Sequence, residues 1–357
     1  MFSHLKVVEL ASVLAGPAAG MFFAELGAQV IKVENKKTGG DVTRNWKNKN
    51  EEASSPLSAY FASVNWGKEH ITLDYTDATD LQKTKEILKT ADIVIANFKP
   101  GDAKKFGLDY TSLKKENPGI IYGNITGFGT NDHRVAYDVV LQAESGFMSM
   151  NGTSESGPVK MPVALIDVLA AHQLKEALLL ALLKKEKTGK GSYCEVSLFD
   201  SAVCSLVNQA SNFLMSGMIP KPAGSLHPNI APYGETFFTS DNRQIVLAIG
   251  SEDQFRHFAE QTGLQEKLLQ PEFSSNALRV KNRSVLALLI APAIKQMSCD
   301  EFMQKMKSKN IPCGVIKSLD EVFADEKTKS LVMEETINGI LTKRVKTVAF
   351  KKDFLND

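Results

Sequence analysis

The stretch over residues 161–200 contains the side chain best suited to covalent chemistry, Asp167. An apolar run over residues 163–166 precedes it and predicts a short strand, and a helical pattern begins just after it. An aspartate at such a boundary is expected to be an N-cap, whose carboxylate accepts a hydrogen bond from a backbone N–H of the first turn. A carboxylate held between apolar residues can instead act as a nucleophile or a base. The local pattern allows both roles, so the rest of the chain must decide between them.

The elements that follow Asp167 are well marked. Leu174, Leu178 and Leu182 fall at helical spacing on one face, lysines fill the last turn, and Gly189 predicts the end of the helix. After Gly191 the apolar residues alternate with a period of two, which is typical of a half-buried strand.

Composition narrows the class of protein. The 357 residues are enough for two domains, and the net charge of +1 favours neither nucleic acid nor an anionic membrane as a partner. The longest aliphatic run, residues 177–183, is too short to cross a bilayer. The N-terminus is expected to be a first strand and not a signal peptide. Four cysteines without metal-ligand spacing indicate reduced thiols, so we expect a cytoplasmic protein.

Strand and helix patterns alternate from residue 5 to residue 129, which predicts an α/β fold of the doubly wound, Rossmann-like kind with a mainly parallel sheet. The first turn lacks the G-x-G-x-x-G fingerprint, so Glu34 is only a weak signal for a nicotinamide-dependent dehydrogenase. We predict a large α/β domain over residues 1–205, a linker over 206–225, a smaller α+β domain over 226–310 and a return segment over 311–357. A buried strand is expected within residues 311–316.

A series of motifs, in this order and spacing, resembles the family III CoA-transferases, which include formyl-CoA transferase and the carnitine-type CoA-transferases. The resemblance spans nearly the whole chain. It rests on LKVVELASVLAGPAAGMFFAELGAQVIKVE, GGDVTR, NFKPG, NPGIIYGNITGFG, AYDVVLQAESG, Asp167, KTGKG, HPNIAPYG and IPCGVI.

The resemblance implies that Asp167 is the nucleophile of a CoA-transferase. Such an enzyme moves CoA from an acyl-CoA thioester to a free carboxylic acid through covalent aspartyl intermediates. Coenzyme A is then a co-substrate, and neither a tightly bound cofactor nor a metal is expected. The family also implies a homodimer of two interlocked chains. The chain ends at Asp357, without the helical tail usual in the family.

Further site residues follow from matching family positions. The turn of Val13, Leu14 and Ala15 is expected to line the CoA pocket. The residues expected around the adenine and phosphates are Lys68, Asn97, Phe98, Lys105 and Phe106. Taken alone, the lysines would be ordinary surface residues and Phe98 an ordinary core residue.

Tyr137 and Asp138 match a pair that faces the nucleophile in the family. In the related α-methylacyl-CoA racemases a histidine takes the place of Tyr137 and shuttles an α-proton. A phenol is a poor base at neutral pH, because its unperturbed pKa is about 10, so Tyr137 favours transfer. The alternative for Tyr137 itself is a buried residue with a hydrogen-bonded hydroxyl. The alternatives for the whole protein are a racemase-like isomerase and a catalytically silent CoA-binding homologue.

Three departures from the family pattern leave questions open. The loop at residues 224–234 lacks a glycine run, although it matches a loop that faces the active site. Asn35 stands where several members carry an arginine that stacks on adenine, and Ala171 replaces a frequent glycine. The acyl groups exchanged are not evident from the sequence.

Overall fold

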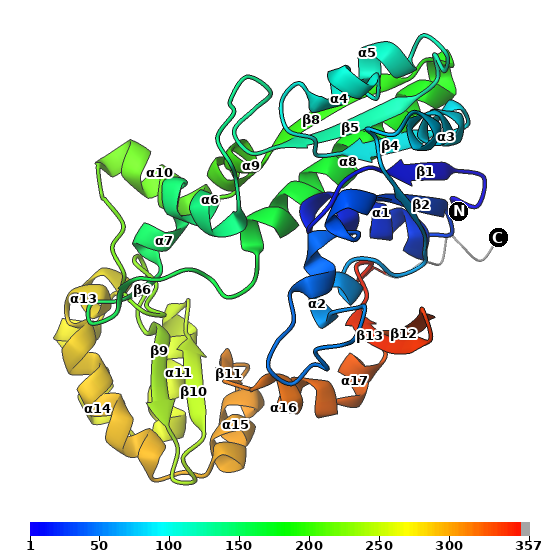
Figure 1. Ribbon diagram of the computed structural model, residues 1–357. Coiled ribbons are helices and arrows are strands. Elements are labelled where there is room, and N and C mark those ends of the chain that lie inside the picture. The colour runs from blue at the N-terminus through cyan, green and yellow to red at the C-terminus, as the bar shows by residue number, and fades with distance from the viewer. Residues whose placement is uncertain (351–357) are drawn as a thin grey trace. The chain divides into compact units, whose positions relative to one another are not determined.

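The computed structural model describes residues 1–350, which form two compact units: residues 1–222 with 327–350, and residues 223–326 (Figure 1). The large unit is built on a six-stranded parallel sheet with strand order β3-β2-β1-β4-β5-β8. Its strands are β1 (Lys6–Glu9), β2 (Gln29–Asn35), β3 (Lys68–Leu73), β4 (Ile93–Ala96), β5 (Ile121–Thr126) and β8 (Ser192–Ser197). The predicted doubly wound α/β class is confirmed.

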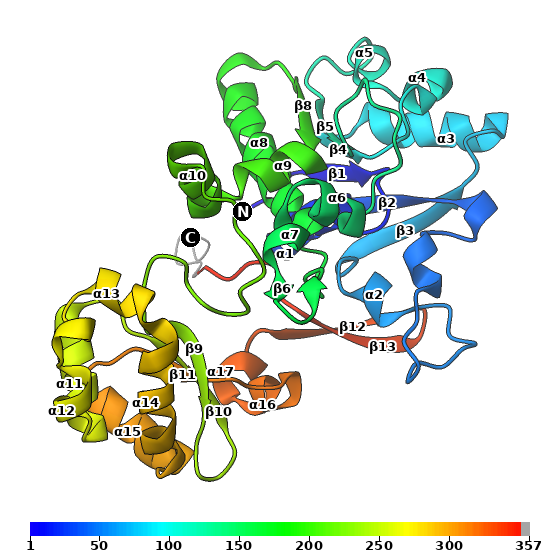
Figure 2. The same ribbon diagram turned by 90° about the vertical axis from the view of Figure 1, so that its left-hand side faces the viewer.

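Helices cover both faces of this sheet (Figure 2). The α-helices between residues 1 and 222 are α1 (Ala15–Glu25), α2 (Ala59–Ala62), α3 (Ala78–Lys89), α4 (Asp102–Phe106), α5 (Tyr110–Leu113), α6 (Asp138–Glu144), α7 (Phe147–Met150), α8 (Leu165–Thr188), α9 (Leu198–Cys204) and α10 (Val207–Ser216). One core packs α1 and α8 against the sheet through Phe23, Leu174 and Leu178. The other core, on the opposite face, includes Leu88 of α3 and Leu113 of α5. Strands buried on both faces explain the nearly continuous apolar runs in the sequence.

The remaining strands of the large unit form two hairpins. They are β6 (Gly152–Thr153) with β7 (Gly157–Pro158), and β12 (Val332–Ile337) with β13 (Ile340–Val345). The second hairpin brings the returning chain to the large unit, where Arg344 pairs with Glu25 of α1 at 2.7 Å.

The small unit has a three-stranded antiparallel sheet in the order β11-β10-β9. Its elements are β9 (Tyr233–Phe238), β10 (Gln244–Ala248), α11 (Glu252–Thr262), α12 (Gln265–Leu268), α13 (Asn276–Lys281), α14 (Arg283–Lys295), α15 (Cys299–Ser308), β11 (Cys313–Val315) and α16 (Leu319–Ala324); α17 (Glu326–Lys329) follows at the boundary.

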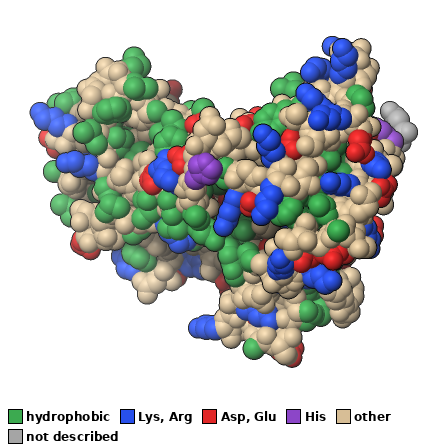
Figure 3. Space-filling model, turned by 45° about the horizontal axis from the view of Figure 1, so that its top comes forward, with side chains coloured by type: hydrophobic (Ala, Val, Ile, Leu, Met, Phe, Trp, Pro, Cys, Tyr) green, Lys and Arg blue, Asp and Glu red, His purple; other side chains and the backbone are tan. Residues whose placement is uncertain are grey.

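Two expected boundaries differ from the structure. The predicted strand at 311–316 exists, but β11 pairs with β10 and so belongs to the small unit, whose compact part extends to residue 326. Residues 206–225, expected as a linker, contain α10, whose apolar side chains are largely exposed. No helix within residues 1–350 is both long and apolar enough to span a membrane. On the face shown in Figure 3, acidic and basic side chains are interspersed.

Candidate active site

The sheet reverses its strand order between β1 and β4, and in doubly wound folds ligands bind at the carboxyl ends of the strands at this point. Two pockets lie there. Pocket A, of about 430 Å³, is lined by residues that follow β1, β2, β3 and β4. Pocket B, of about 470 Å³, is lined by residues that follow β4 and β5 and by Val13. Both include Asn97, Phe98, Lys99 and Asp102, so the segment after β4 separates them.

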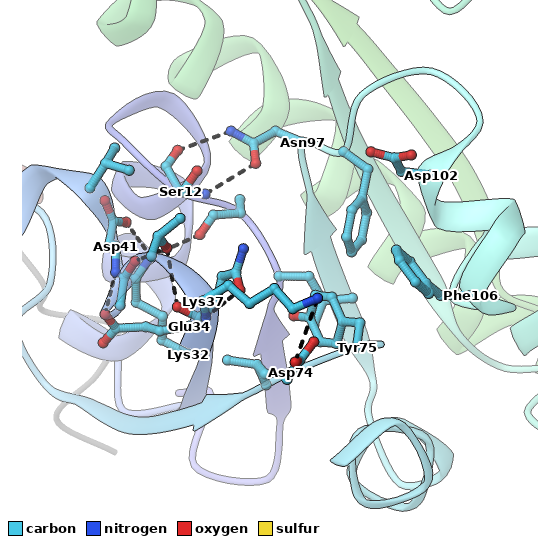
Figure 4. A pocket seen from close by; sticks show the side chains of 18 of the residues that line it. Ser12, Lys32, Glu34, Lys37, Asp41, Asp74, Tyr75, Asn97, Asp102 and Phe106 are labelled. Carbon is cyan, nitrogen blue, oxygen red and sulfur yellow. Dashed lines mark hydrogen bonds and ion pairs between the residues drawn. The ribbon is translucent and has the colours of Figure 1, made fainter. Parts of the chain in front are cut away.

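Pocket A has an aromatic wall and a charged rim (Figure 4). The Tyr75 ring centroid lies 5.8 Å from that of Phe98 and 5.9 Å from that of Phe106. Lys37 reaches across the rim to Asp74, at 3.7 Å. Aromatic faces beside an exposed ammonium suit a flat heterocycle that carries phosphate.

The turn between β1 and α1 borders both pockets. Asn97 holds this turn by accepting from the Ser12 backbone N–H at 3.1 Å and donating to the Ser12 carbonyl at 2.9 Å. Val13 has a φ of 74°, a left-handed conformation that is unusual for a β-branched residue. Its backbone N–H donates to the Asp41 carboxylate at 3.2 Å.

Asp167 is the third residue of α8 and not its N-cap, and residues 163–166 form no strand. Within residues 1–350 its carboxylate accepts no hydrogen bond, and its residue surface is only 8% exposed. Burial, and secondarily the charge of Asp138, raise the pKa of Asp167 to about 7. The carboxyl group therefore changes between its protonated and ionised forms near neutral pH, and no donor within residues 1–350 stabilises the ionised form.

The capping role falls to Asp138, at the start of α6. Asp138 Oδ1 accepts from the Ile166 backbone N–H at 2.7 Å, so it satisfies a free donor of the first turn of α8. Asp138 Oδ2 accepts from Gln142 Nε2 at 2.5 Å, and Gln142 Oε1 accepts from the Met161 N–H at 2.7 Å. This pair ties the segment before α8 to α6 and fixes the position of Asp167.

Tyr60 was not predicted from the sequence, because it stands alone on the short helix α2. Burial, followed by the charges of Asp167 and Asp138, raises the pKa of Tyr60 to about 12. Its phenol therefore stays protonated near the two carboxylates. Tyr137 lines pocket B and is 52% exposed, which is inconsistent with the alternative of a buried, structural tyrosine.

The other predicted residues separate into two groups. Val13, Asn97, Phe98 and Phe106 line the pockets, whereas Leu14 packs against the α1–α8 contact beside Ala15. Lys68, expected near phosphates, is buried: its Nζ bonds to Glu9 Oε2, the Pro17 carbonyl and Asn65 Oδ1. Lys105 lies 5.5 Å from the centroid of its neighbour Phe106 and does not line pocket A.

Glu34 does not act as a ribose-binding acid in this structure. Its carboxylate accepts from Arg44 at 2.7 Å, from the Asp41 N–H at 2.6 Å and contacts His70 at 3.0 Å. Glu34, the residue that weakly suggested a dehydrogenase, is therefore part of a structural ion pair. In the described part of the chain there is no cluster of His, Cys, Asp or Glu suited to a metal ion.

The family model described as CoA-transferase family III matches residues 2–354. The chain is 35% identical to the succinate–glutarate CoA-transferase of Agrobacterium fabrum, over 92% of this chain and 83% of that protein. It is 32% identical to human succinyl-CoA:glutarate CoA-transferase, over 92% and 75% of the two chains.

Solved structures give the same result. A CaiB/BaiF family protein from Brucella suis superposes with a TM-score of 0.83 at 37% identity, covering 98% of this chain and 92% of that one. An aspartate-to-alanine mutant of a Mycobacterium tuberculosis protein superposes with a TM-score of 0.84 at 26% identity, with the same coverage. The chain therefore belongs to CoA-transferase family III, and it is a transferase.

Proposed function

We propose that this enzyme transfers CoA between carboxylic acids through covalent intermediates on Asp167. The Asp167 carboxylate attacks the thioester carbonyl of the donor acyl-CoA and expels CoA thiolate, which forms a mixed anhydride. The thiolate then attacks the aspartyl carbonyl of the anhydride, so the donor acid leaves and an aspartyl-CoA thioester remains. The acceptor carboxylate then attacks the aspartyl-CoA carbonyl and expels CoA thiolate, which gives a second anhydride. The thiolate attacks the acceptor's carbonyl in this anhydride, so the new acyl-CoA forms and the Asp167 carboxylate is released.

The observation that carries this proposal is a buried carboxylate without hydrogen-bond donors among the described residues, close to Asp138 and the Tyr60 phenol. No proton is gained or lost in the cycle, so no histidine base is required. Developing oxyanions need neutral donors. The Tyr60 hydroxyl is one candidate, and the N–H groups of Leu14 and Ala15, which bond to no other residue within 1–350, are further ones.

The substrates proposed are dicarboxylic acids and their CoA thioesters. The relatives named above act on succinate and glutarate, and an Acetobacter aceti relative, 30% identical, is named acetyl-CoA:oxalate CoA-transferase. The test is an assay with succinyl-CoA against acetate, oxalate, glutarate and mesaconate, followed by mass detection of new acyl-CoAs. Formation of a new thioester with any dicarboxylate supports the proposal. Exchange of solvent deuterium at the α-carbon without transfer would favour an isomerase, and CoA binding without either reaction a silent homologue.

Pocket A is proposed to hold the adenosine end of CoA, with the ring between Tyr75, Phe98 and Phe106. Lys37, which lies on the rim of pocket A, is the proposed phosphate partner. Replacing Phe106→Ala is expected to weaken CoA binding about tenfold, because base–aromatic stacking contributes roughly 1–3 kcal/mol. Calorimetric titration with CoA measures this, with the exposed Phe238→Ala as control. Equal affinities of the two variants for CoA would contradict the assignment of the adenosine to pocket A.

The enzyme is proposed to be a homodimer. Apolar side chains around α10 are unusually exposed: Val207 (71%), Leu214 (78%), Met215 (89%) and Ile219 (69%). Such a cluster on a folded protein indicates a covered face, and a second copy is the occupant implied by the family. Light scattering is expected to give twice the 39.1 kDa of one chain. Met215→Glu should shift the mass toward one chain, whereas Met215→Leu should not; a wild-type monomer would contradict the assignment.

The cytoplasmic location expected from the sequence is part of the same proposal. The four cysteines are free thiols, as a reducing compartment would leave them.

A further inference from the structure

The turn that borders both pockets is held in a conformation its own sequence disfavours. Val13 is β-branched, yet its φ of 74° places it in the left-handed region. Three of the other non-glycine residues with positive φ are asparagines, which tolerate this region. A strained residue at a ligand-binding turn persists only where its surroundings hold it.

Asp41, from the GGDVTR motif, supplies this hold. Its carboxylate accepts from the Val13 N–H at 3.2 Å and 3.4 Å. The same carboxylate is oriented by the Thr43 N–H at 3.0 Å and the Thr43 hydroxyl at 2.8 Å, and it pairs with Lys32 at 3.0 Å. Asp41, Thr43 and Lys32 are 3%, 0% and 1% exposed, so water does not compete for these bonds.

The charged groups behind Asp41 hold the turn at two more points. Lys32 pairs with Glu9 at 2.7 Å and donates to the Ala11 carbonyl at 2.8 Å. Lys68 pairs with the other oxygen of Glu9 at 2.7 Å and donates to the Pro17 carbonyl at 2.9 Å. Lys32, Asp41 and Lys68 thus contact the backbone before, at and after Val13, and Glu9 pairs with both lysines. Burying four charges is costly, so their arrangement around one turn calls for a functional reason.

We propose that Asp41 is a positioning residue for acyl-CoA binding and that it acts through the backbone of Val13. By turning the Val13 N–H inward, Asp41 aims the Val13 side chain at pocket B and leaves the next N–H groups free for the ligand. This role rests on the proposed function, because it takes CoA as the ligand of the pockets. The proposal also assigns a role to Lys68, which helps to hold the turn around Val13 and does not bind phosphate.

The test is a double-mutant cycle on the full chain, with the dissociation constant of CoA as readout. Asp41→Asn is expected to weaken binding about tenfold. Glycine adopts a positive φ without strain, so in a Val13→Gly background the same substitution should weaken binding by no more than about twofold. Thr43→Val keeps the charge of Asp41 and removes one hydrogen-bond donor to it. It should cause a smaller loss of CoA affinity, which Val13→Gly should likewise suppress. This variant replaces Asp41→Asn in the cycle if Asp41→Asn does not fold.

Equal losses in both backgrounds would overturn the proposal, since Asp41 would then act on the fold as a whole. Thermal midpoints measured in parallel give a second form of the cycle: Val13→Gly should reduce the destabilisation caused by Asp41→Asn. This coupling does not require CoA. Failure of the wild type to bind CoA would therefore count against the proposed function, while the stability cycle would still decide whether Asp41 acts through Val13.

Discussion

Asp167→Asn is expected to lower the rate of CoA transfer by about ten-thousandfold or more, while CoA still binds. The amide has the shape of the carboxylate but cannot attack a thioester, and removal of a nucleophile typically costs this much. The fold should be retained, because the Asp167 carboxylate accepts no hydrogen bond from the described residues. Steady-state transfer rates and calorimetric CoA affinity measure the two effects separately.

The chain offers a matched control. Asp200 is the third residue of α9, as Asp167 is of α8, but it is exposed. Asp200→Asn is expected to change the rate by less than about twofold, as surface substitutions usually do. An Asp167→Asn variant that keeps a tenth of the wild-type rate would show that another group carries the reaction.

The second large effect is a dependence of activity on pH. Only the ionised carboxylate is a nucleophile, and the pKa of Asp167 is raised to about 7. We expect kcat/KM to fall about tenfold for each pH unit below that value, so that roughly one hundredth remains at pH 5. Asp138→Asn removes the charge that adds to the burial effect, so the acidic limb should move to lower pH. A rate that is constant between pH 5 and pH 8 would contradict the raised pKa.

The same pKa predicts a cost in stability. A carboxyl group with a raised folded-state pKa binds its proton more tightly in the folded than in the unfolded chain. Stability is therefore lost as the pH rises from about 4 to about 7, by at most roughly 4 kcal/mol. Asp167→Asn should accordingly raise the thermal midpoint at pH 8 more than at pH 4, with Asp200→Asn showing no such difference.

The sequence was sufficient to predict the parallel sheet and its helices, because each strand and helix buries an apolar run with its own period. It also indicated Val13, Asn97, Phe98 and Phe106, which line the two pockets, whereas Asp167 lines neither of them. Tyr75 follows β3 directly, at the carboxyl edge, so it was within reach of the same argument.

What the sequence did not reveal depends on partners that are distant in the chain. The cap of α8 is Asp138, 28 residues away from Ile166, so the local pattern alone could not exclude Asp167 as the cap. Lys68 finds Glu9 59 residues away, and no local pattern distinguishes such a buried lysine from a surface one. Strand β11 joins the small unit through pairing with β10, which is again a long-range contact. Tyr60 lies near Asp167 although the two residues are distant in the chain.

The measurement that tests the central claim most directly is the intact mass of the enzyme after brief incubation with succinyl-CoA. The account predicts an adduct of the mass of CoA or of the acyl group on the wild type, removed by hydroxylamine and located on the peptide that contains Asp167. The adduct should be absent from Asp167→Asn and present on Asp200→Asn. A wild-type enzyme that transfers CoA at full rate without any adduct, or one whose adduct lies on another residue, would contradict it.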